Sequence, residues 1–303
     1  MTERPVATRC GFIALIGAPN AGKSTLLNAL VGAKVAIVSA KPQTTRMRVL
    51  GIINEGASQL IYVDTPGIFT PKRRLDRAMV RAAWSGAGDA DIVALVVDAA
   101  RKQIADDTRE IVNKLAEAGR PAMLILNKVD ATERPRLLAI AAALNAAFAF
   151  TDTFMVSALT GDGLDELRRI FAERVSEGPW LYPEDQLSDI PTRLLAAEIT
   201  REQLYLQLGQ ELPYASAVEH ETWEEREDGS VAIRQAILVE RPGQKAIVIG
   251  KGGARIKAIG EAARKELVEA LGRPVHLFLH VKVQEKWAED PSHYRDVGLD
   301  WRA

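Results

Sequence analysis

Short apolar runs alternate with stretches of helical spacing over the first 175 positions. The runs that predict strands are Phe12–Gly17, Leu60–Val63, Asp91–Asp98, Ala122–Asn127 and Thr153–Ser157. Segments with helical spacing and a polar face are Lys23–Leu30, Leu75–Ser85, Asp106–Ala118, Arg134–Asn145 and Leu164–Val175. This alternation predicts an α/β fold with a mostly parallel sheet flanked by helices. Ligands of such sheets bind beyond the carboxyl ends of the strands, so the loops there are the first place to look for chemistry.

The pattern changes after position 175. Residues 176–191 contain three prolines and little periodicity, which indicates an interdomain linker. We therefore assign residues 1–175 to one domain and residues 192–303 to a second. The elements expected in the second domain are a helix, a hairpin turning at Asp228-Gly229, a glycine-broken helical region and a last strand: Thr192–Gln207, Ala215–Arg226, Val231–Glu240, Gln244–Leu271 and Val275–Val283.

Composition limits the protein class. The 303 residues are 47% hydrophobic and 26% charged, as in an ordinary globular protein. The net charge of -1 excludes a protein that binds a polyanion through the overall positive charge of its chain. A single cysteine, Cys10, excludes a disulfide framework and a Cys-based zinc site. The longest uncharged stretch has fifteen residues, too few for a membrane span, and the first residues do not look like a signal peptide. We expect a cytoplasmic protein, and a monomer.

The first motif follows the first predicted strand and opens a helix. It has the form G-x-x-x-x-G-K-[ST], with one further threonine: Gly17, Ala18, Pro19, Asn20, Ala21, Gly22, Lys23, Ser24 and Thr25. Glycines allow backbone amides to surround phosphate oxygens, and the helix N-terminus adds its positive end. Lys23 would neutralise the outer phosphates, and the Ser24 hydroxyl would bind Mg²⁺. The motif predicts a nucleoside triphosphate site.

A second motif, made by Asp64, Thr65, Pro66 and Gly67, follows the strand Leu60–Val63. Asp64 would hold the magnesium ion, and the Gly67 amide would face the terminal phosphate. Between the two motifs, Lys34–Arg48 has four basic and no acidic residues. A threonine there would join the magnesium shell only with the third phosphate present, and we prefer Thr45 to Thr44 because it directly precedes Arg46. An ordinary solvated loop is the alternative. We assign catalytic roles to Lys23, Thr45 and Gly67.

The base is expected to be guanine. Asn127, Lys128 and Asp130 end the fourth predicted strand, and the Asp130 carboxylate would accept from the ring N–H and the exocyclic amine of guanine. Adenine lacks that donor pair, and unpaired buried groups are costly, so the discrimination is sharp. Ser157, Ala158 and Leu159 follow the next strand and would support the base. A polar strand exit is the alternative for Asn127–Asp130.

The second domain contains a G-x-x-G segment between apolar helical stretches. Its residues are Ile249, Gly250, Lys251, Gly252, Gly253, Arg255 and Ile256. Such a loop allows a nucleic-acid backbone to come close, as in the KH-type clamp, which holds about four single-stranded nucleotides. Residues 241–286 hold ten Lys and Arg against four Glu, a local basic patch in a neutral chain. Taken alone, G-x-x-G is more often a simple turn; the surrounding elements favour the clamp.

Taken together, GAPNAGKST, PQTTR, DTPG, NKVD and SAL resemble the five guanine-nucleotide motifs of the translation-factor-like GTPases, and more closely those of the Era family. The resemblance extends over the whole chain. It implies a P-loop GTPase domain followed by an α+β type-2 KH domain, with GTP or GDP and Mg²⁺ as ligands. It also implies binding to the 3′ end of 16S ribosomal RNA, a role in 30S subunit assembly and peripheral contact with the inner membrane.

Two positions bear on hydrolysis. Ile68 stands where Ras-like enzymes have the glutamine that orients water, so we expect slow turnover and help from backbone or a partner. Asn20 stands where similar GTPases use an asparagine for K⁺, but an asparagine also suits a tight turn, and the sequence leaves both interpretations open. Two other functions stay open as well, a tRNA-modification GTPase and a membrane-associated regulatory GTPase.

Overall fold

The computed structural model describes residues 7–71, 73–291, 294 and 299–302. These residues pack as two compact units. The first unit runs up to Ala36, continues over Thr45–Asp189 and includes residues 299–302, while the second contains Ile37–Thr44 and the chain from Ile190 to Tyr294. An eight-residue segment between the first two motifs thus packs with the second unit and not with its neighbours in sequence.

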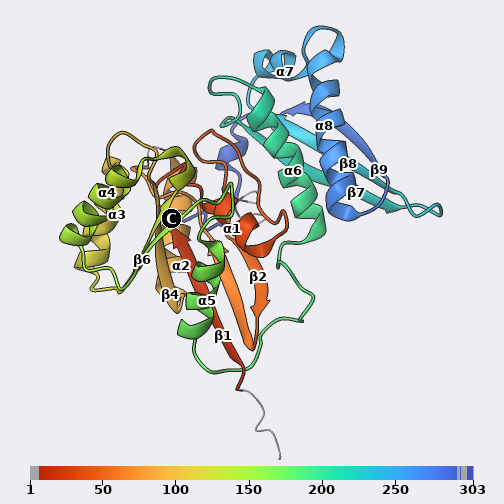
Figure 1. Cartoon of the computed structure of the whole chain (residues 1–303). Helices are drawn as coiled ribbons and strands as arrows, with labels where there is room; N and C mark the ends of the chain where they lie inside the picture. The colour runs from red at the N-terminus through yellow and green to blue at the C-terminus, as the bar shows by residue number, and fades with distance from the viewer. Residues whose placement is uncertain (1–6, 72, 292–293, 295–298, 303) are drawn as a thin grey trace, which may run out of the picture. The chain divides into compact units, whose positions relative to one another are not determined.

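The first unit is built on a six-stranded sheet. In chain order its strands are β1 (Arg9–Ile16), β2 (Val49–Glu55), β3 (Ser58–Asp64), β4 (Ile92–Asp98), β5 (Met123–Asn127) and β6 (Thr153–Val156). They lie in the order β2-β3-β1-β4-β5-β6, and all pairs are parallel except the antiparallel pair β2–β3 (Figure 1). The edge strand β2 was not among the strands predicted from sequence.

Five helices cover this sheet: α1 (Lys23–Val31), α2 (Arg74–Asp89), α3 (Asp106–Glu117), α4 (Arg134–Ala147) and α5 (Leu164–Arg174). Apolar residues of α2, α3 and α4 form one buried cluster with alternate residues of β1, β4 and β5, such as Ile16, Leu95 and Leu124. Helices α1 and α5 pack against each other and against β2 and β3. The strand ends between these layers carry the phosphate loop and the guanine motif.

The expected linker is a packed segment for most of its length. The Gln59 side-chain oxygen accepts hydrogen bonds from the backbone N–H groups of Leu181 and Tyr182, at 2.9 and 3.0 Å. The Ser188 hydroxyl donates to the Leu50 carbonyl at 2.6 Å, and Leu187 O accepts from Ile52 N at 2.9 Å. Residues up to Asp189 therefore run along the β2–β3 side of the first unit.

The elements of the second unit that frame its sheet, among the described residues, are α6 (Thr192–Gln207), β7 (Ser216–Glu225), β8 (Val231–Val239), α7 (Pro242–Ile249), α8 (Ala254–Leu271) and β9 (Val275–Val283). The central strand β8 pairs antiparallel with β7 and parallel with β9. Helices α6 and α8 lie side by side on one face of the sheet, where Ile199, Ile233 and Leu267 pack together (Figure 1). Among the helices of the described residues, none is long and apolar enough to cross a membrane.

Candidate functional site

The phosphate loop connects β1 to α1, and its backbone needs glycine at two positions. Gly17 has φ +154° and Gly22 has φ +91°. A Cβ atom at Gly17 would lie 2.3 Å from the Val96 carbonyl oxygen, and one at Gly22 would lie 2.3 Å from Asn127 Nδ2. Asn20 adopts a left-handed conformation with φ 64°, which asparagine tolerates better than most residues. The loop is therefore packed closely against β4 and the Asn127 side chain.

Lys23 lies at the base of this loop and is buried. Its Nζ atom donates to the Gly17 and Ala18 carbonyl oxygens at 3.0 and 3.1 Å. Burial lowers the pKa of Lys23 to about 8, and the carboxylate of Asp64 opposes that shift. A buried cation among turned amides is suited to a ligand that carries several negative charges.

Three hard oxygen ligands converge beside Lys23. Ser24 Oγ donates to Asp64 Oδ2 at 2.6 Å and lies 2.8 Å from Thr45 Oγ1, which in turn lies 3.4 Å from Asp64 Oδ2. Asp64 is fully buried, and its Oδ1 atom has no hydrogen-bond partner among the described residues. Burial raises the pKa of Asp64 to about 6, with Lys23 acting in the opposite direction. Two hydroxyl groups beside a buried carboxylate that has one unpaired oxygen fit Mg²⁺.

The structure separates the two candidate threonines. Thr45 belongs to the oxygen cluster in the first unit, whereas Thr44 belongs to the second. The Thr44 hydroxyl donates to the Lys41 carbonyl at 2.8 Å and lies 2.5 Å from the Ser39 hydroxyl. Only Thr45 is within reach of Ser24 and Asp64.

Beyond the Asp64 carboxylate, the second motif contributes backbone more than side chains. The Thr65 hydroxyl donates to the Leu15 carbonyl at 2.9 Å, so that side chain ties β3 to β1. A Cβ atom at Gly67 would lie 3.0 Å from atoms of Pro19, which places the Gly67 backbone against the phosphate loop. Ile68 is 2% exposed and packs in the core with α2 and α3. Its side chain therefore has no access to a water molecule at the phosphate.

Residues of the guanine motif are tied to each other and to the loop. Asn127 Nδ2 donates to the Ala21 carbonyl at 3.0 Å, and Asn127 Oδ1 accepts from the backbone N–H groups of Lys128 and Ala158 at 2.8 and 3.0 Å. The Ser157 hydroxyl donates to Asp130 Oδ1 at 2.6 Å. This bond orients the Asp130 carboxylate and leaves its second oxygen for a base. The Ala158 amide, which we expected to face the base, is bonded here to Asn127.

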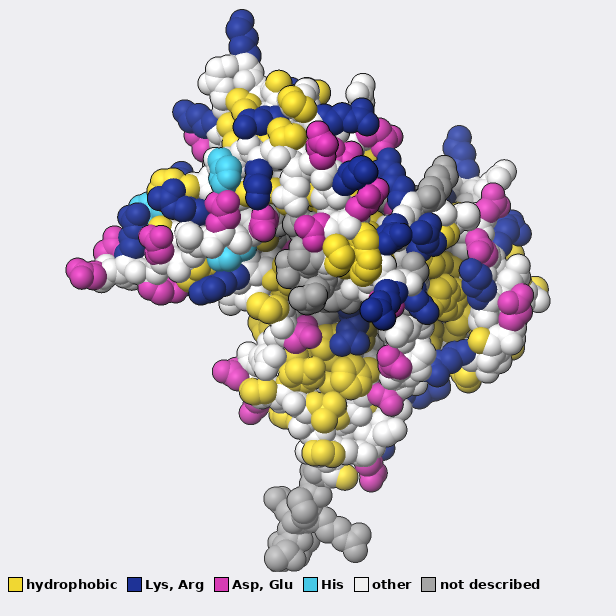
Figure 2. Space-filling view, turned by 180° about the vertical axis from the view of Figure 1, so that it is seen from behind, with side chains coloured by type: hydrophobic (Ala, Val, Ile, Leu, Met, Phe, Trp, Pro, Cys, Tyr) yellow, Lys and Arg dark blue, Asp and Glu magenta, His cyan; other side chains and the backbone are white. Residues whose placement is uncertain are grey.

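The glycine loop of the second unit joins α7 to α8. Gly250, Gly252 and Gly253 have φ values of 73°, 60° and 80°. Lys251 is exposed, and Arg255 donates through Nη1 to the Ile247 carbonyl at 2.9 Å, which joins the two sides of the loop. Figure 1 shows this loop and the β7–β8 hairpin at different ends of the unit, and Figure 2 shows acidic side chains at the hairpin tip. The acidic hairpin tip and the glycine loop are thus apart.

A hollow of about 490 Å³ runs between α8 and the edge strand β9, next to this loop. Its lining combines two cations and one carboxylate with an aromatic ring and apolar side chains, with Lys257, Glu261, Arg264, His276 and Phe278 among them. Phe278 is 44% exposed, and the Arg234 guanidinium lies 4.9 Å from its ring centroid. Charged side chains beside an exposed ring suit a single strand of nucleic acid, which offers phosphates and flat bases. Lys257 and Arg264 belong to the basic patch of residues 241–286 recognised from the sequence, whereas Phe278 was not identified from it.

Comparisons with known proteins agree with this geometry. A family model described as 50S ribosome-binding GTPase matches residues 12–128, and one described as KH domain matches residues 211–288. GTPase Era of Bradyrhizobium sp. (strain ORS 278) is 60% identical over 295 residues, which cover 97% of this chain and 96% of that protein. The chain belongs to the Era family of GTPases. It is therefore a GTP hydrolase, and the predicted family is confirmed.

Further Era proteins match over nearly their whole length. GTPase Era of Rhizobium meliloti (strain 1021) is 60% identical over 296 residues, covering 98% of this chain and 94% of its own. Two solved structures each superpose with a TM-score of 0.90 at 38% identity, covering 96% of this chain and 99% of theirs. One is Era of Aquifex aeolicus bound to GDP and AlF4−, and the other is Era with MgGDPNP and nucleotides 1506–1542 of 16S ribosomal RNA. The predicted fold class, a P-loop GTPase domain and a KH domain, is confirmed.

Two residues beside the phosphate loop, Asp98 and Arg101, were not identified from the sequence. Lys128 Nζ, from the guanine motif, lies 2.6 Å from Asp98 Oδ2 at the end of β4. The Arg101 guanidinium, three residues further on, donates to the Pro19 carbonyl at 3.2 Å. The sequence does place Asp98 at the carboxyl end of a predicted strand, where ligands bind. Its partner Lys128 is thirty residues away, so the sequence does not show the contact.

Proposed function

We propose that this Era-family chain binds the 3′ end of 16S ribosomal RNA through its second unit, under the control of GTP, during assembly of the 30S subunit. The observation that carries the proposal is the Gly250–Gly253 loop with its adjoining hollow, in a chain that matches a solved Era–RNA complex over 96% of its length. The domain limits we propose are those expected from sequence, residues 1–175, 176–191 and 192–303.

At the nucleotide site we propose that Ser24, Thr45 and Asp64 hold Mg²⁺, with Lys23 beside the outer phosphates. The bound ion would neutralise phosphate charge. The protein's own contributions are a preformed loop of amides, a buried cation and the Gly67 backbone set against Pro19. Because Ile68 is in the core, water must be oriented by other groups, so slow intrinsic hydrolysis follows. K⁺ at Asn20 belongs to this proposal, and equal hydrolysis rates in Na⁺ and K⁺ buffers would remove it.

Coupling between GTP and RNA is proposed to run through Ile37–Thr44, which packs with the second unit on α6. Glu202 Oε1 accepts from the Val38 N–H at 2.7 Å, and Lys41 Nζ donates to the Leu208 carbonyl at 2.7 Å and to the Tyr205 carbonyl. The next residue, Thr45, belongs to the proposed magnesium ligands. A nucleotide that fixes Thr45 therefore acts on a segment held by the first helix of the RNA-binding unit.

Buried charge strengthens this attachment. Arg201 on α6 is 3% exposed, donates through Nη2 to the Thr44 carbonyl at 2.6 Å and is held by Glu198, 2.7 Å from its Nε. Because linkage is reciprocal, GTP that raises RNA affinity is matched by RNA that raises GTP affinity by the same factor. The variant Arg201→Met should reduce that factor toward one. An RNA dissociation constant that is the same with GTP analogue and with GDP in the unmodified protein would defeat the coupling.

The experiment that tests the RNA partner is crosslinking in cells followed by sequencing of the bound RNA. A peak at the 3′ end of 16S ribosomal RNA supports the proposal. Crosslinks mainly to tRNA would support a tRNA-modification GTPase. An absence of RNA, together with flotation on vesicles of anionic lipid, would support a membrane-associated regulatory GTPase. Cytoplasmic location, peripheral contact with the inner membrane and a monomeric state are parts of the proposal that fractionation and light scattering test.

A further inference from the structure

Five consecutive carbonyl groups of the phosphate loop accept hydrogen bonds from side chains. Lys23 donates to two of them, and Arg101, Lys128 and Asn127 donate to the carbonyl oxygens of Pro19, Asn20 and Ala21 at 3.2, 2.9 and 3.0 Å. A peptide group is planar, so fixing a carbonyl also fixes the N–H of the following residue. The donors around the loop therefore determine where its amides lie.

Two of these donors share one carboxylate. Asp98 Oδ2 lies 2.6 Å from Lys128 Nζ and 3.7 Å from Arg101 Nε. The other oxygen, Oδ1, accepts from the Ala100 N–H at 2.9 Å, and the side chain is 12% exposed. Asp98 ends β4 and is paired in register with Asn127, the last residue of β5. The carboxylate is thus fixed by the sheet and by the turn that follows it.

We propose that Asp98 is a positioning residue for guanine nucleotide binding. Acting through Lys128 and Arg101, it sets the Pro19 and Asn20 peptide planes, and with them the form of the loop that accepts phosphates. This inference rests on nucleotide binding by the first unit and is independent of the RNA partner.

The ion pairs themselves contribute little stability. The Lys128 and Arg101 side chains are 37% and 41% exposed, and solvent screens ion pairs that reach it. The effect of the two cations on the loop conformation is larger. Arg101 and Lys128 also donate to carbonyl groups of the loop, in which Asn20 has positive φ. Removing the carboxylate charge should therefore change ligand affinity more than folding.

The test is Asp98→Asn, which keeps the size of the side chain and the oxygen that accepts from Ala100. Measured by stopped-flow release of a fluorescent GDP, the dissociation rate should rise about tenfold, which corresponds to a loss of about 1.4 kcal/mol of binding free energy. The affinity for GTP should fall equally. At saturating GTP, kcat should change less than about twofold, and the preference for GTP over xanthosine triphosphate should stay, since Asp130 is untouched.

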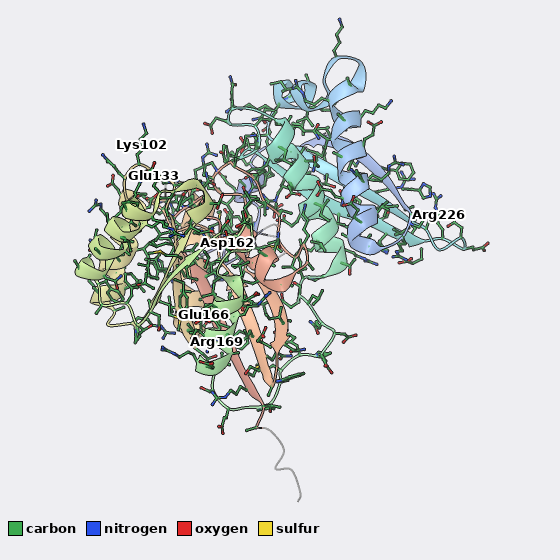
Figure 3. All side chains as sticks on the ribbon, in the orientation of Figure 1. Lys102, Glu133, Asp162, Glu166, Arg169 and Arg226 are labelled. Carbon is green, nitrogen blue, oxygen red and sulfur yellow. The ribbon has the colours of Figure 1, made fainter. Side chains whose placement is uncertain are left out.

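Two further variants make the result specific. Arg101→Met should give a smaller increase of the same kind, and the double variant should give less than the product of the two increases, because both act through one path. Lys102→Ala is the matched control: Lys102 is exposed in the same loop and projects away from the fold in Figure 3, so nucleotide release should not change. If Asp98→Asn does not fold, Arg101→Met alone carries the test.

Several outcomes would overturn the inference. A lower melting temperature with an unchanged GDP release rate would make Asp98 a stabilising residue only. A fall in kcat at unchanged affinity would place its effect in the chemical step, and a loss of base preference would place it at the guanine. If the unmodified protein retained no guanine nucleotide, the assignment of the nucleotide site itself would fail.

Discussion

Gly22 and Gly252 both have positive φ, +91° and +60°, in loops that lead into a helix, yet their surroundings differ. At Gly22 an added Cβ atom would lie 2.3 Å from the Asn127 side chain, whereas at Gly252 no atom would lie within 4 Å. Five carbonyl groups of the first loop accept from side chains, two from Lys23 and three from residues of other elements. At the second loop, the Arg255 side chain donates to the Ile247 carbonyl and so joins the two sides of the base. The first loop is enclosed at Gly22. The second is open at Gly252, although a Cβ atom at Gly250 would lie 2.8 Å from the Cβ atom of Arg255.

The difference corresponds to the shape of the ligand that each loop is proposed to take. A nucleotide is compact and highly charged, and a loop whose amides are fixed beforehand spends little free energy on ordering when it binds. A nucleic-acid strand is long, so its binding loop must leave space on both sides and can rely on exposed cations such as Lys251. The same residue type, glycine, provides close packing in one place and open approach in the other.

The largest effect is expected in the enclosed site, from Asp130→Asn. This variant removes the carboxylate oxygens that would face the donors of guanine, so GTP affinity should fall about a thousandfold while xanthosine triphosphate gains. Asp162→Asn, in the neighbouring loop and labelled in Figure 3, is the control and should leave both affinities unchanged. Isothermal titration calorimetry with GTP and with xanthosine triphosphate measures the two affinities. Equal losses of affinity for the two nucleotides would contradict the prediction.

A second prediction concerns enclosure itself. Gly22→Ala places a methyl group against Asn127 and strains a backbone at φ +91°, so GDP affinity should fall about hundredfold. Gly32→Ala is the matched control, since Gly32 has φ +74° at the end of α1 but no atom within 4 Å of an added Cβ. That change should cost about 1 kcal/mol of stability and leave affinity intact. Similar GDP affinities for the two variants would show that strain, not packing, shapes the loop.

The sequence predicted the enclosed loop well because its glycines, lysine and serine occur at fixed spacing between a strand and a helix. It also predicted α6 and β9 with the bounds that the structure has. Spacing alone could not predict Asp98, because its bonds with Lys128 and Arg101 depend on β4 and β5 lying side by side. The packing of Ile37–Thr44 on α6 likewise depends on residues distant in sequence, so no local pattern indicates it. The strand β2 was not predicted because its formation depends on pairing with β3.

Lys251→Ala tests the open loop. A single phosphate contact contributes mainly counterion release, so affinity for a single-stranded RNA should fall about tenfold and the slope of log affinity against log salt should become shallower by about one. Arg226→Ala removes a cation from the far hairpin, labelled in Figure 3, and should change neither quantity. Fluorescence anisotropy at several salt concentrations measures both. An unchanged slope would mean that Lys251 does not contact phosphate.

The smallest effect is expected from Gly252→Ala compared with Gly252→Asn. No neighbour restricts either side chain, so only the backbone conformation at φ +60° and ψ +22° is affected. Alanine should reduce the free energy of unfolding by about 1 kcal/mol, whereas asparagine, which adopts left-handed backbone more readily, should cost less. Urea denaturation measures the difference, and GDP affinity should be the same in both variants. A loss at Gly252 as large as that at Gly22 would mean that the second loop is enclosed as well, and the distinction between the two loops would fail.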